Sequence, residues 1–452
     1  MPTAIRISVI GAGSAQFSLG LVKDLCLTPG LSGSLVSFMD VDAERLEMIE
    51  KLARRYASEV GSDLRFERTA ERAASLRDAS IVINTASVVS HHAQRAVREL
   101  TAKHGYYYGG VHIDGGRQLA FMLSVAQDIE RICPDAWLIQ SGNPVYEGCT
   151  LMTRETGIKI CGLCHGHYGV YEIARVLGLD PAKIDWQAPG LNHNIWLTHF
   201  LHEGKNAYPL LEAWIAAKGE EYWRSHIAER THDIQMSRGT IHMYRMFGLM
   251  PIGDTPRQRR NWWYHTDLAT KKHWFGEPWG GPDTELARPY FVENLEKGIA
   301  QMTRLANDPK ASLVEAFGSE KTREQQVPII DGLVNNNAYF AQVNIPNKGA
   351  LAGVADDVVV EVPALVNAKG IQPLRVHPLP PKIMLEMILP EVLDMERELL
   401  AFKEGDRTML LCQTLNSPQT RSYDQAMAVL NDLLDAPELQ EVAAHYQWPK
   451  GW

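Results

Sequence analysis

The segment that decides the fold is Ala4-Ile5-Arg6-Ile7-Ser8-Val9-Ile10-Gly11-Ala12-Gly13-Ser14-Ala15-Gln16-Phe17. An apolar strand pattern runs straight into Gly-x-Gly and then into a helix pattern. Gly11 lets the chain turn tightly as the strand ends, and Gly13 lets the backbone approach a bound pyrophosphate. The helix that begins near Ser14 directs its unpaired N–H groups and positive dipole end at that phosphate. Gln16 replaces the third glycine of the G-x-G-x-x-G fingerprint, so the motif needs support from its context.

That support comes from a second strand pattern, residues 35–39, which ends in Asp40, 27 residues after Gly13. This offset suits a carboxylate that binds the adenosine ribose, although an acid at a strand end is often only a cap for the next helix. We therefore predict an NAD site. The residues expected to form it are Gly11, Gly13, Ser14 and Asp40, together with Thr85 and Asn143 from later strand ends.

Strand and helix patterns alternate through the first third of the chain, which favours a parallel, doubly wound α/β sheet. Further buried strands are expected over residues 79–86, 136–140 and 157–163. Ligands in such sheets bind at the carboxyl ends of the strands. We predict a Rossmann-type domain over residues 1–165. A mixed α+β domain over residues 166–452 would bind substrate and metal and mediate oligomerisation, as in the lactate and malate dehydrogenase architecture. The loop-rich, Trp-rich residues 251–281 would form a pocket wall.

Composition excludes several classes of function. The 452 residues carry 45 Lys and Arg against 54 Asp and Glu, a net charge of −9, which argues against a nucleic-acid or anionic-membrane partner. No apolar run reaches the roughly 18 residues of a membrane span, and the first residues do not form a signal peptide. Six cysteines in so long a chain do not make a disulfide framework. We expect a cytoplasmic protein.

Cys164 and His193 each follow an apolar strand, and thiolate and imidazole both bind borderline divalent metals. Their separation of 29 residues rules out a compact finger, and spacing alone favours a buried Cys and an unrelated His. Cys161 and Cys164 also match a redox C-x-x-C pattern, but Cys161 lies inside a strand pattern rather than at a helix start.

Other polar residues could take part in acid–base chemistry or anion binding. Each has a plain structural alternative as a turn former, a helix cap or a solvent-facing side chain. Asp114 lies in a glycine-rich loop, and Arg117 follows two glycines whose N–H groups can form an anion-binding nest. The remaining candidates are His165, His167, Asn143 and Asp254.

Taken together, these motifs resemble those of the family 4 glycoside hydrolases, NAD-dependent α-glycosidases that also need a divalent metal. The resemblance runs through most of the chain and is carried by Val9-Ile10-Gly11-Ala12-Gly13-Ser14, Asn143-Pro144, Cys164-His165-Gly166-His167-Tyr168-Gly169, Asn192-His193, Pro251-Ile252-Gly253-Asp254-Thr255, Asn344-Ile345-Pro346-Asn347-Lys348-Gly349 and Val359–Val366. It implies that Cys164 and His193 bind the metal, usually Mn²⁺, with His193 also near the substrate. It further implies that Asn143 contacts the substrate and that Asp254 is the base.

The Cys-His-Gly-His-Tyr-Gly run is similar to the α-glucosidase branch of that family. The glycine-rich segment before Gln118 is shorter than in that branch and carries Gly115-Gly116-Arg117 instead. A related group cleaves α-sulfoquinovosides, in which C6 of glucose carries a sulfonate. Arg117 beside a glycine nest would suit this fixed negative charge. The expected substrate is therefore either a neutral α-glucoside or its 6-sulfo analogue.

The resemblance also implies a mechanism. Hydride passes from C3 of the sugar to NAD⁺, the metal-polarised ketone acidifies the C2 proton, and Asp254 removes that proton directly or through metal-bound water. The C1 substituent leaves with help from Asp114 or His165, water adds, and the hydride returns. The alternative is an NAD-dependent sugar or hydroxy-acid dehydrogenase, which would consume NAD⁺ stoichiometrically. The expected partners are a small carbohydrate substrate and further copies of the chain in a homo-oligomer, a dimer or tetramer.

Overall fold

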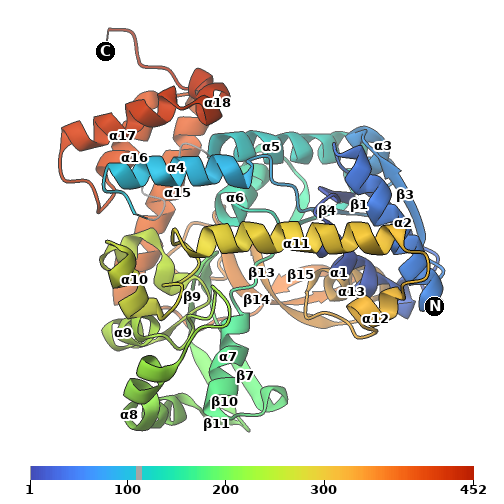
Figure 1. The fold of residues 1–452 in the computed structure, drawn as a ribbon, viewed down its shortest axis with the longest axis horizontal. Coiled ribbons are helices and arrows are strands. Elements are labelled where there is room, and N and C mark those ends of the chain that lie inside the picture. The colour runs from blue at the N-terminus through green and yellow to red at the C-terminus, as the bar shows by residue number, and fades with distance from the viewer. Residues whose placement is uncertain (1, 108–114, 452) are drawn as a thin grey trace.

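The computed structural model describes residues 2–107 and 115–451, and the elements are arranged as in Figure 1. The strands are β1 (Arg6–Ile10), β2 (Leu35–Met39), β3 (Arg65–Thr69), β4 (Ile81–Asn84), β5 (Trp137–Gln140), β6 (Lys159–Gly162), β7 (Ile184–Gln187), β8 (Gly190–Leu191), β9 (Asn194–Leu197), β10 (His199–His202), β11 (Lys205–Asn206), β12 (Met250–Ile252), β13 (Tyr339–Pro346), β14 (Val359–Asn367) and β15 (Gly370–Pro373).

The longer helices cover both faces of the main sheet or pack beyond its edges. They are α1 (Ala15–Cys26), α2 (Ala43–Glu59), α4 (His91–Lys103), α5 (Gly115–Ile132), α6 (Val145–Glu155), α7 (Tyr168–Leu177), α8 (Tyr208–Ser225), α9 (Arg238–Phe247), α10 (Leu268–Phe275), α11 (Ala287–Asn307), α13 (Gln326–Asn335), α15 (Leu389–Glu404), α16 (Arg407–Leu415) and α17 (Tyr423–Asp435). The shorter ones are α3 (Arg72–Leu76), α12 (Leu313–Phe317), α14 (Pro381–Ile383) and α18 (Gln440–His445).

The main sheet has the order β12-β9-β8-β14-β13-β6-β5-β4-β1-β2-β3, with β15 paired to β14. The six strands from β6 to β3 are parallel, which is the Rossmann order and confirms the predicted fold class. From β13 onward the sheet continues with antiparallel strands. One sheet thus runs through both predicted domains, and the boundary at residue 165 stays a prediction.

Strand β1 shows why this sheet is covered by helices on both faces. Ile7 and Val9 belong to one buried apolar cluster, whereas Ile10 belongs to another. Because successive side chains of a strand point to opposite faces, a strand that is apolar on both faces needs a layer of helices on each. The strand order reverses between β1 and β4, so the crevice for a ligand opens at the carboxyl ends of these two strands.

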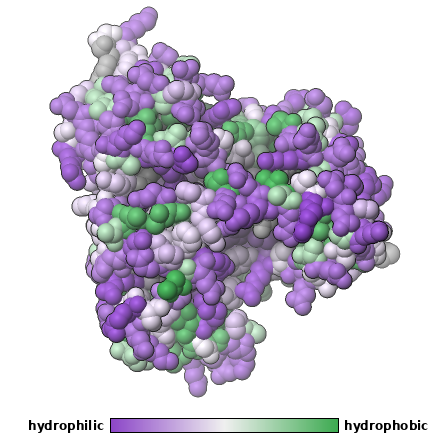
Figure 2. Space-filling model, in the orientation of Figure 1, coloured by the Kyte–Doolittle hydropathy of each residue, from purple (hydrophilic) through white to green (hydrophobic). Residues whose placement is uncertain are grey.

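The C-terminal helices α15–α18 pack on one another in sequence, and α17 packs against α4 (Figure 1). A third apolar cluster there joins Val97 and Tyr106 to Leu410, Leu430 and Leu433. Polar side chains cover most of the face shown in Figure 2, and the hydrophobic residues there form small, separate patches. Within residues 2–107 and 115–451, no helix combines the length and the apolar character that crossing a bilayer requires.

Candidate active site

The turn from β1 into α1 presses directly against the end of β4. Gly11 has φ +84°, and a Cβ at this position would lie 2.6 Å from the Cα of Ala86. Neither the backbone conformation nor the available space accepts a side chain here. Thr85 stabilises the same turn, because its Oγ1 donates a hydrogen bond that the carbonyls of Ile10 and Gly11 share, at 3.2 and 3.1 Å.

Asp40 reaches back to this turn from the end of β2. Its Oδ2 accepts a 2.7 Å hydrogen bond from the N–H of Gly13, and its Oδ1 accepts one from the N–H of Asp42 at 3.1 Å. The side chain that caps α2 is that of Asp42, which accepts from the N–H of Arg45. The capping alternative for Asp40 is therefore wrong, and its carboxylate lies beside the glycine turn. Ser14 occupies the N-cap of α1 without a side-chain cap bond, so it leaves the helix N–H groups for a ligand.

Cys164 follows β6 and lies at the carboxyl edge of the parallel strands. Its thiol contacts the side chain of Asn192 and the backbone N–H of Gly166. Asn192 in turn donates from Nδ2 to Oε2 of Glu361 at 3.0 Å, and this carboxyl group is almost fully buried in β14. Burial raises the pKa of the Cys164 thiol well above its usual range, and the negative groups Glu361 and Asp254 add to that rise. The thiol therefore carries its proton at neutral pH, and a bound cation would have to displace that proton.

His193 occupies the two-residue turn between β8 and β9, in which Leu191 pairs with Asn194. Its backbone φ is +63°, a region that residues other than glycine seldom occupy. Gln258 holds the strained turn by donating from Nε2 to the carbonyl of His193 at 2.9 Å. The imidazole Nε2 lies 3.5 Å from Oδ2 of Asp254. Strain of this kind persists where the surroundings enforce it, which is frequent at functional sites.

Asp254 follows β12, and Arg257 clamps its carboxylate. The guanidinium donates to Oδ1 from Nε at 2.8 Å and to Oδ2 from Nη2 at 2.7 Å. Arg257 and His193 hold the pKa of the Asp254 carboxyl well below its usual range despite burial, which acts in the opposite direction. Asp254 is therefore ionised at neutral pH.

Two glycines bring the Cys164 loop and the Asp254 loop together. Gly253 has φ +62°, and a Cβ there would lie 2.5 Å from the Cα of Gly166. The two backbones are thus in direct contact, with no room for a side chain between them. Gln235 fixes the same approach, because its Oε1 accepts from the N–H of Gly253 at 2.8 Å and its Nε2 donates to the carbonyl of Pro251 at 2.9 Å.

The other predicted site residues are placed as follows. His165, next to Cys164, is exposed, and its Nε2 lies 2.9 Å from Oε2 of Glu324; this hydrogen bond raises the pKa of the imidazole. Asn143 is exposed just after the end of β5.

Arg117 lies in the first turn of α5. Its described ion pair, 3.5 Å long, is with Glu441 of α18 and not with a residue near Cys164. Asp114 lies outside the described residues.

The donor set suits a divalent metal that keeps open positions. The His193 imidazole lies 3.5 Å from the Asp254 carboxylate, and the same carboxylate acts on the pKa of the Cys164 thiol. A thiolate and an imidazole are donors that suit Zn²⁺ or Fe²⁺ better than Ca²⁺. In the part of the chain that the structure describes, no cluster of three or more His, Cys, Asp and Glu side chains is arranged to hold an ion. A metal held by Cys164 and His193 would thus leave coordination positions for substrate and water.

Sequence reasoning missed the supporting residues Glu361, Arg257 and Glu324. Glu361 carried a signal, because it is the one charged residue within the run Val358-Val359-Val360-Glu361-Val362. A carboxylate in an otherwise apolar strand is expected to have a specific partner. Arg257 and Glu324 lie in polar stretches where nothing distinguishes them from solvent-exposed charges.

Comparison with known proteins identifies relatives along most of the chain. The model described as family 4 glycosyl hydrolase matches residues 6–179, and the model of the family 4 glycosyl hydrolase C-terminal domain matches residues 188–420. The alpha-glucosidase of Erwinia rhapontici is 26% identical over 415 residues, covering 84% of this chain and 86% of that protein. The alpha-galacturonidase of Thermoanaerobacter italicus (strain DSM 9252 / Ab9) is 22% identical over 486 residues, covering 99% and 98%.

Solved structures share the fold. A 6-phospho-alpha-glucosidase from gut microorganisms, in complex with NAD and Mn²⁺, superposes with a TM-score of 0.78 at 18% identity, covering 99% of this chain and all of that one. The lactate dehydrogenase of Eimeria maxima, with NADH and oxamate, gives a TM-score of 0.51 at 14% identity, covering 90% and 97%. The predicted likeness to the lactate dehydrogenase architecture is confirmed.

Proposed function

The chain belongs to the family 4 glycosyl hydrolases, and we propose that it hydrolyses α-glycosides of gluco-configured sugars using NAD⁺ and a divalent metal, which is Mn²⁺ or another divalent ion. The observation that supports this proposal is the position of Asp254. Its carboxylate lies 3.5 Å from the imidazole of His193, and its charge raises the pKa of the Cys164 thiol. A related 6-phospho-alpha-glucosidase was crystallised with NAD and Mn²⁺, which supports both cofactors.

The glycine turn would hold the dinucleotide. The pyrophosphate would lie against the backbone of the turn at Gly11 and Gly13 and at the N-terminus of α1 beside Ser14, and Asp40 would bind the adenosine ribose. Thr85 orders the β4 edge on which the nicotinamide side would rest. Cys164 and His193 would hold the metal. When bound, NAD⁺ supplies a transient oxidation at C3 of the sugar and the metal polarises the resulting carbonyl, which acidifies the C2 proton.

Asp254 then removes the C2 proton. Its carboxylate is ionised at neutral pH, the form that a base requires, and Arg257 fixes its orientation. The low pKa also makes it a weak base, so deprotonation depends on the prior oxidation at C3. His165 is a fitting acid for the leaving group, because its bond to Glu324 keeps the imidazole protonated to higher pH. Asp114 is the other proposed acid, and Asn143 would bind sugar hydroxyl groups.

The substituent at C6 of the sugar is the open part of the proposal. Relatives include an alpha-glucosidase and an alpha-galacturonidase, so family membership covers both neutral and acidic sugars. Arg117, the residue expected to bind a sulfonate, pairs with Glu441, which weakens the argument that was based on it. A neutral α-glucoside and the 6-sulfo analogue are both proposed substrates.

The test is a panel of nitrophenyl α-glucoside, α-galactoside, α-glucuronide and α-sulfoquinovoside assayed with NAD⁺ and Mn²⁺. We expect nitrophenol release from the α-glucoside or the α-sulfoquinovoside, dependence on both cofactors, and no accumulation of NADH. Stoichiometric NADH without nitrophenol release would support the dehydrogenase alternative instead. The homo-oligomer, dimer or tetramer, stays a prediction that light scattering after size exclusion tests.

A further inference from the structure

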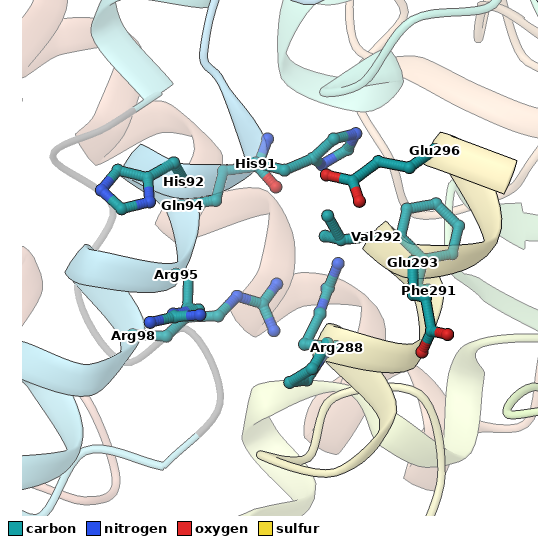
Figure 3. A pocket seen from close by; sticks show the side chains of 11 residues that line it. His91, His92, Gln94, Arg95, Arg98, Arg288, Phe291, Val292, Glu293 and Glu296 are labelled. Atoms are coloured by element: carbon teal, nitrogen blue, oxygen red, sulfur yellow. The ribbon is translucent and has the colours of Figure 1, made fainter. Parts of the chain in front are cut away.

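A cavity of about 350 Å³ lies between the N-terminal halves of α4 and α11 (Figure 3). Arg98 comes from α4 and Arg288 from α11, and Figure 3 shows both side chains extending into the space between the helices. Both guanidinium groups donate to the same carboxylate oxygen, Oδ1 of Asp283, from 3.0 and 2.8 Å. The two helices that line the cavity are therefore joined through Asp283.

The second oxygen of Asp283 points to the candidate active site. Its Oδ2 accepts a hydrogen bond from Nη1 of Arg257, the residue whose Nε and Nη2 clamp Asp254. The Asp283 side chain is only 4% exposed. Three guanidinium groups hold its pKa well below the usual range, so it is a buried, fully ionised group.

This arrangement restrains Arg257 against rotating away from Asp254. One end of its planar guanidinium is bound by the Asp254 carboxylate, and the far nitrogen is bound by Asp283. Asp283 is in turn bound to α4 and α11, two long helices that pack elsewhere on the fold. A clamp fixed at both ends holds a side chain within the few tenths of an ångström that proton transfer demands.

We propose that Asp283 is a positioning residue for the reaction: it fixes Arg257, through which it orients the Asp254 carboxylate, and anchors this clamp to the two helices that line the cavity. The inference rests on the proposed function, in which Asp254 removes the C2 proton. The Asp283 side chain is almost fully buried, and both of its oxygens bind guanidinium groups. Its effect should therefore fall on the proton-transfer step and not on the binding of NAD⁺ or sugar.

The first variant is Asp283→Asn, which keeps the shape but removes the charge that balances three arginines. We expect kcat to fall about tenfold to a hundredfold, KM to stay within about twofold, and the NAD⁺ affinity measured by fluorescence titration to stay unchanged. Asp283→Glu restores the charge and should recover part of the lost kcat. The matched control is Asp128→Asn, since Asp128 bridges Arg72 and Arg131 away from this cluster.

A buried charge cluster can also fail to fold when one member is lost, so a thermal melt accompanies each variant. Arg98→Gln removes the most exposed of the three arginines that bind Asp283 and should lower kcat about twofold to fivefold with an unchanged melting temperature. The inference is overturned if Asp283→Asn and Arg98→Gln, both folded, keep the wild-type kcat, or if KM rises while kcat is retained. Failure of the proposed function is a separate result, because the wild-type enzyme would then release no sugar from any α-glycoside.

Discussion

The contact between Gly253 and Gly166 holds the Asp254 loop against the Cys164 loop, and Gly253→Ala tests whether this approach makes the site. A methyl group at position 253 would lie 2.5 Å from the Cα, 2.7 Å from the carbonyl oxygen and 2.9 Å from the carbonyl carbon of Gly166. All three atoms are backbone, so no side chain can rotate to make room. The two loops must move apart.

The size of the effect follows from that geometry. Ordinary contacts begin near 3.4 Å, so the loops must separate by about 1 Å. A misplacement of about 1 Å between reacting groups lowers turnover by about a hundredfold. The strain of alanine at φ +62° and the overpacking together should reduce the free energy of unfolding by about 2–4 kcal/mol. We expect kcat/KM to fall by about two orders of magnitude in a protein that still folds.

The matched control is Gly248→Ala. Gly248 is the C-cap of α9 and has φ +82°, but a Cβ there would meet no atom within 4 Å. This variant carries the backbone strain without the clash, so it should lose about 1 kcal/mol of stability and keep kcat/KM within about twofold. Both variants are assayed with NAD⁺ and Mn²⁺ on the best substrate of the panel, beside thermal melts. Equal activity in the two variants would refute the argument that this loop contact assembles the site.

Three further predictions address the cofactors and the core. Cys164→Ser should weaken Mn²⁺ binding by at least tenfold in a metal titration and leave the NAD⁺ affinity unchanged. The control Cys412→Ser, at an exposed thiol, should change neither affinity. An unaltered metal affinity in Cys164→Ser would exclude Cys164 as a ligand. Asp40→Ala should lower NAD⁺ affinity about tenfold in fluorescence titrations without affecting metal binding, and an unchanged affinity would remove Asp40 from the ribose site. Burial lowers the pKa of His265 from 6.5 to about 3, so the unfolded chain binds a proton that the folded chain does not. The contribution of His265 to the free energy of unfolding should therefore fall by about 1.4 kcal/mol per pH unit as the pH drops from 6.5 towards 3. The His265→Asn variant should lose less melting temperature between pH 7 and pH 5 than the wild type does.

The fold was predictable where the pattern is local. The strand–glycine–helix run around Gly11 and the alternation after it follow from hydrophobic period and turn chemistry, which neighbouring residues determine. Helix α11 was not predicted, and the reason is physical: of its 21 residues only Ala287, Met302, Leu305 and Ala306 are buried. With so few buried positions, the sequence of this helix shows almost no helical periodicity of apolar residues. The helix that carries Arg288 could therefore not be predicted. Similarly, α10 forms inside the stretch 251–281 that was expected to be loop-rich.

The candidate site was only partly predictable because tertiary pairing assembles it. His193 comes to lie beside Asp254 because β8 and β9 join the sheet next to β14, and spacing in the sequence contains no information on that pairing. The prediction that Cys164 and His193 share one metal site came from the resemblance to a family and not from their spacing. Asp40 and Asp42 are equally good caps by composition, and only the hydrogen bond from Gly13 separates their roles.

The account depends on proton removal from C2 of the sugar by a carboxylate that Arg257 holds in place beside the Cys164 and His193 pair. Hydrolysis of the preferred α-glycoside in D₂O, followed by NMR of the released sugar, tests this most directly. We predict that deuterium enters at C2 during turnover, and that an Asp254→Asn variant loses this incorporation together with bond cleavage. Rapid release of sugar with the original hydrogen retained at C2 would contradict the elimination route and the role assigned to Asp254.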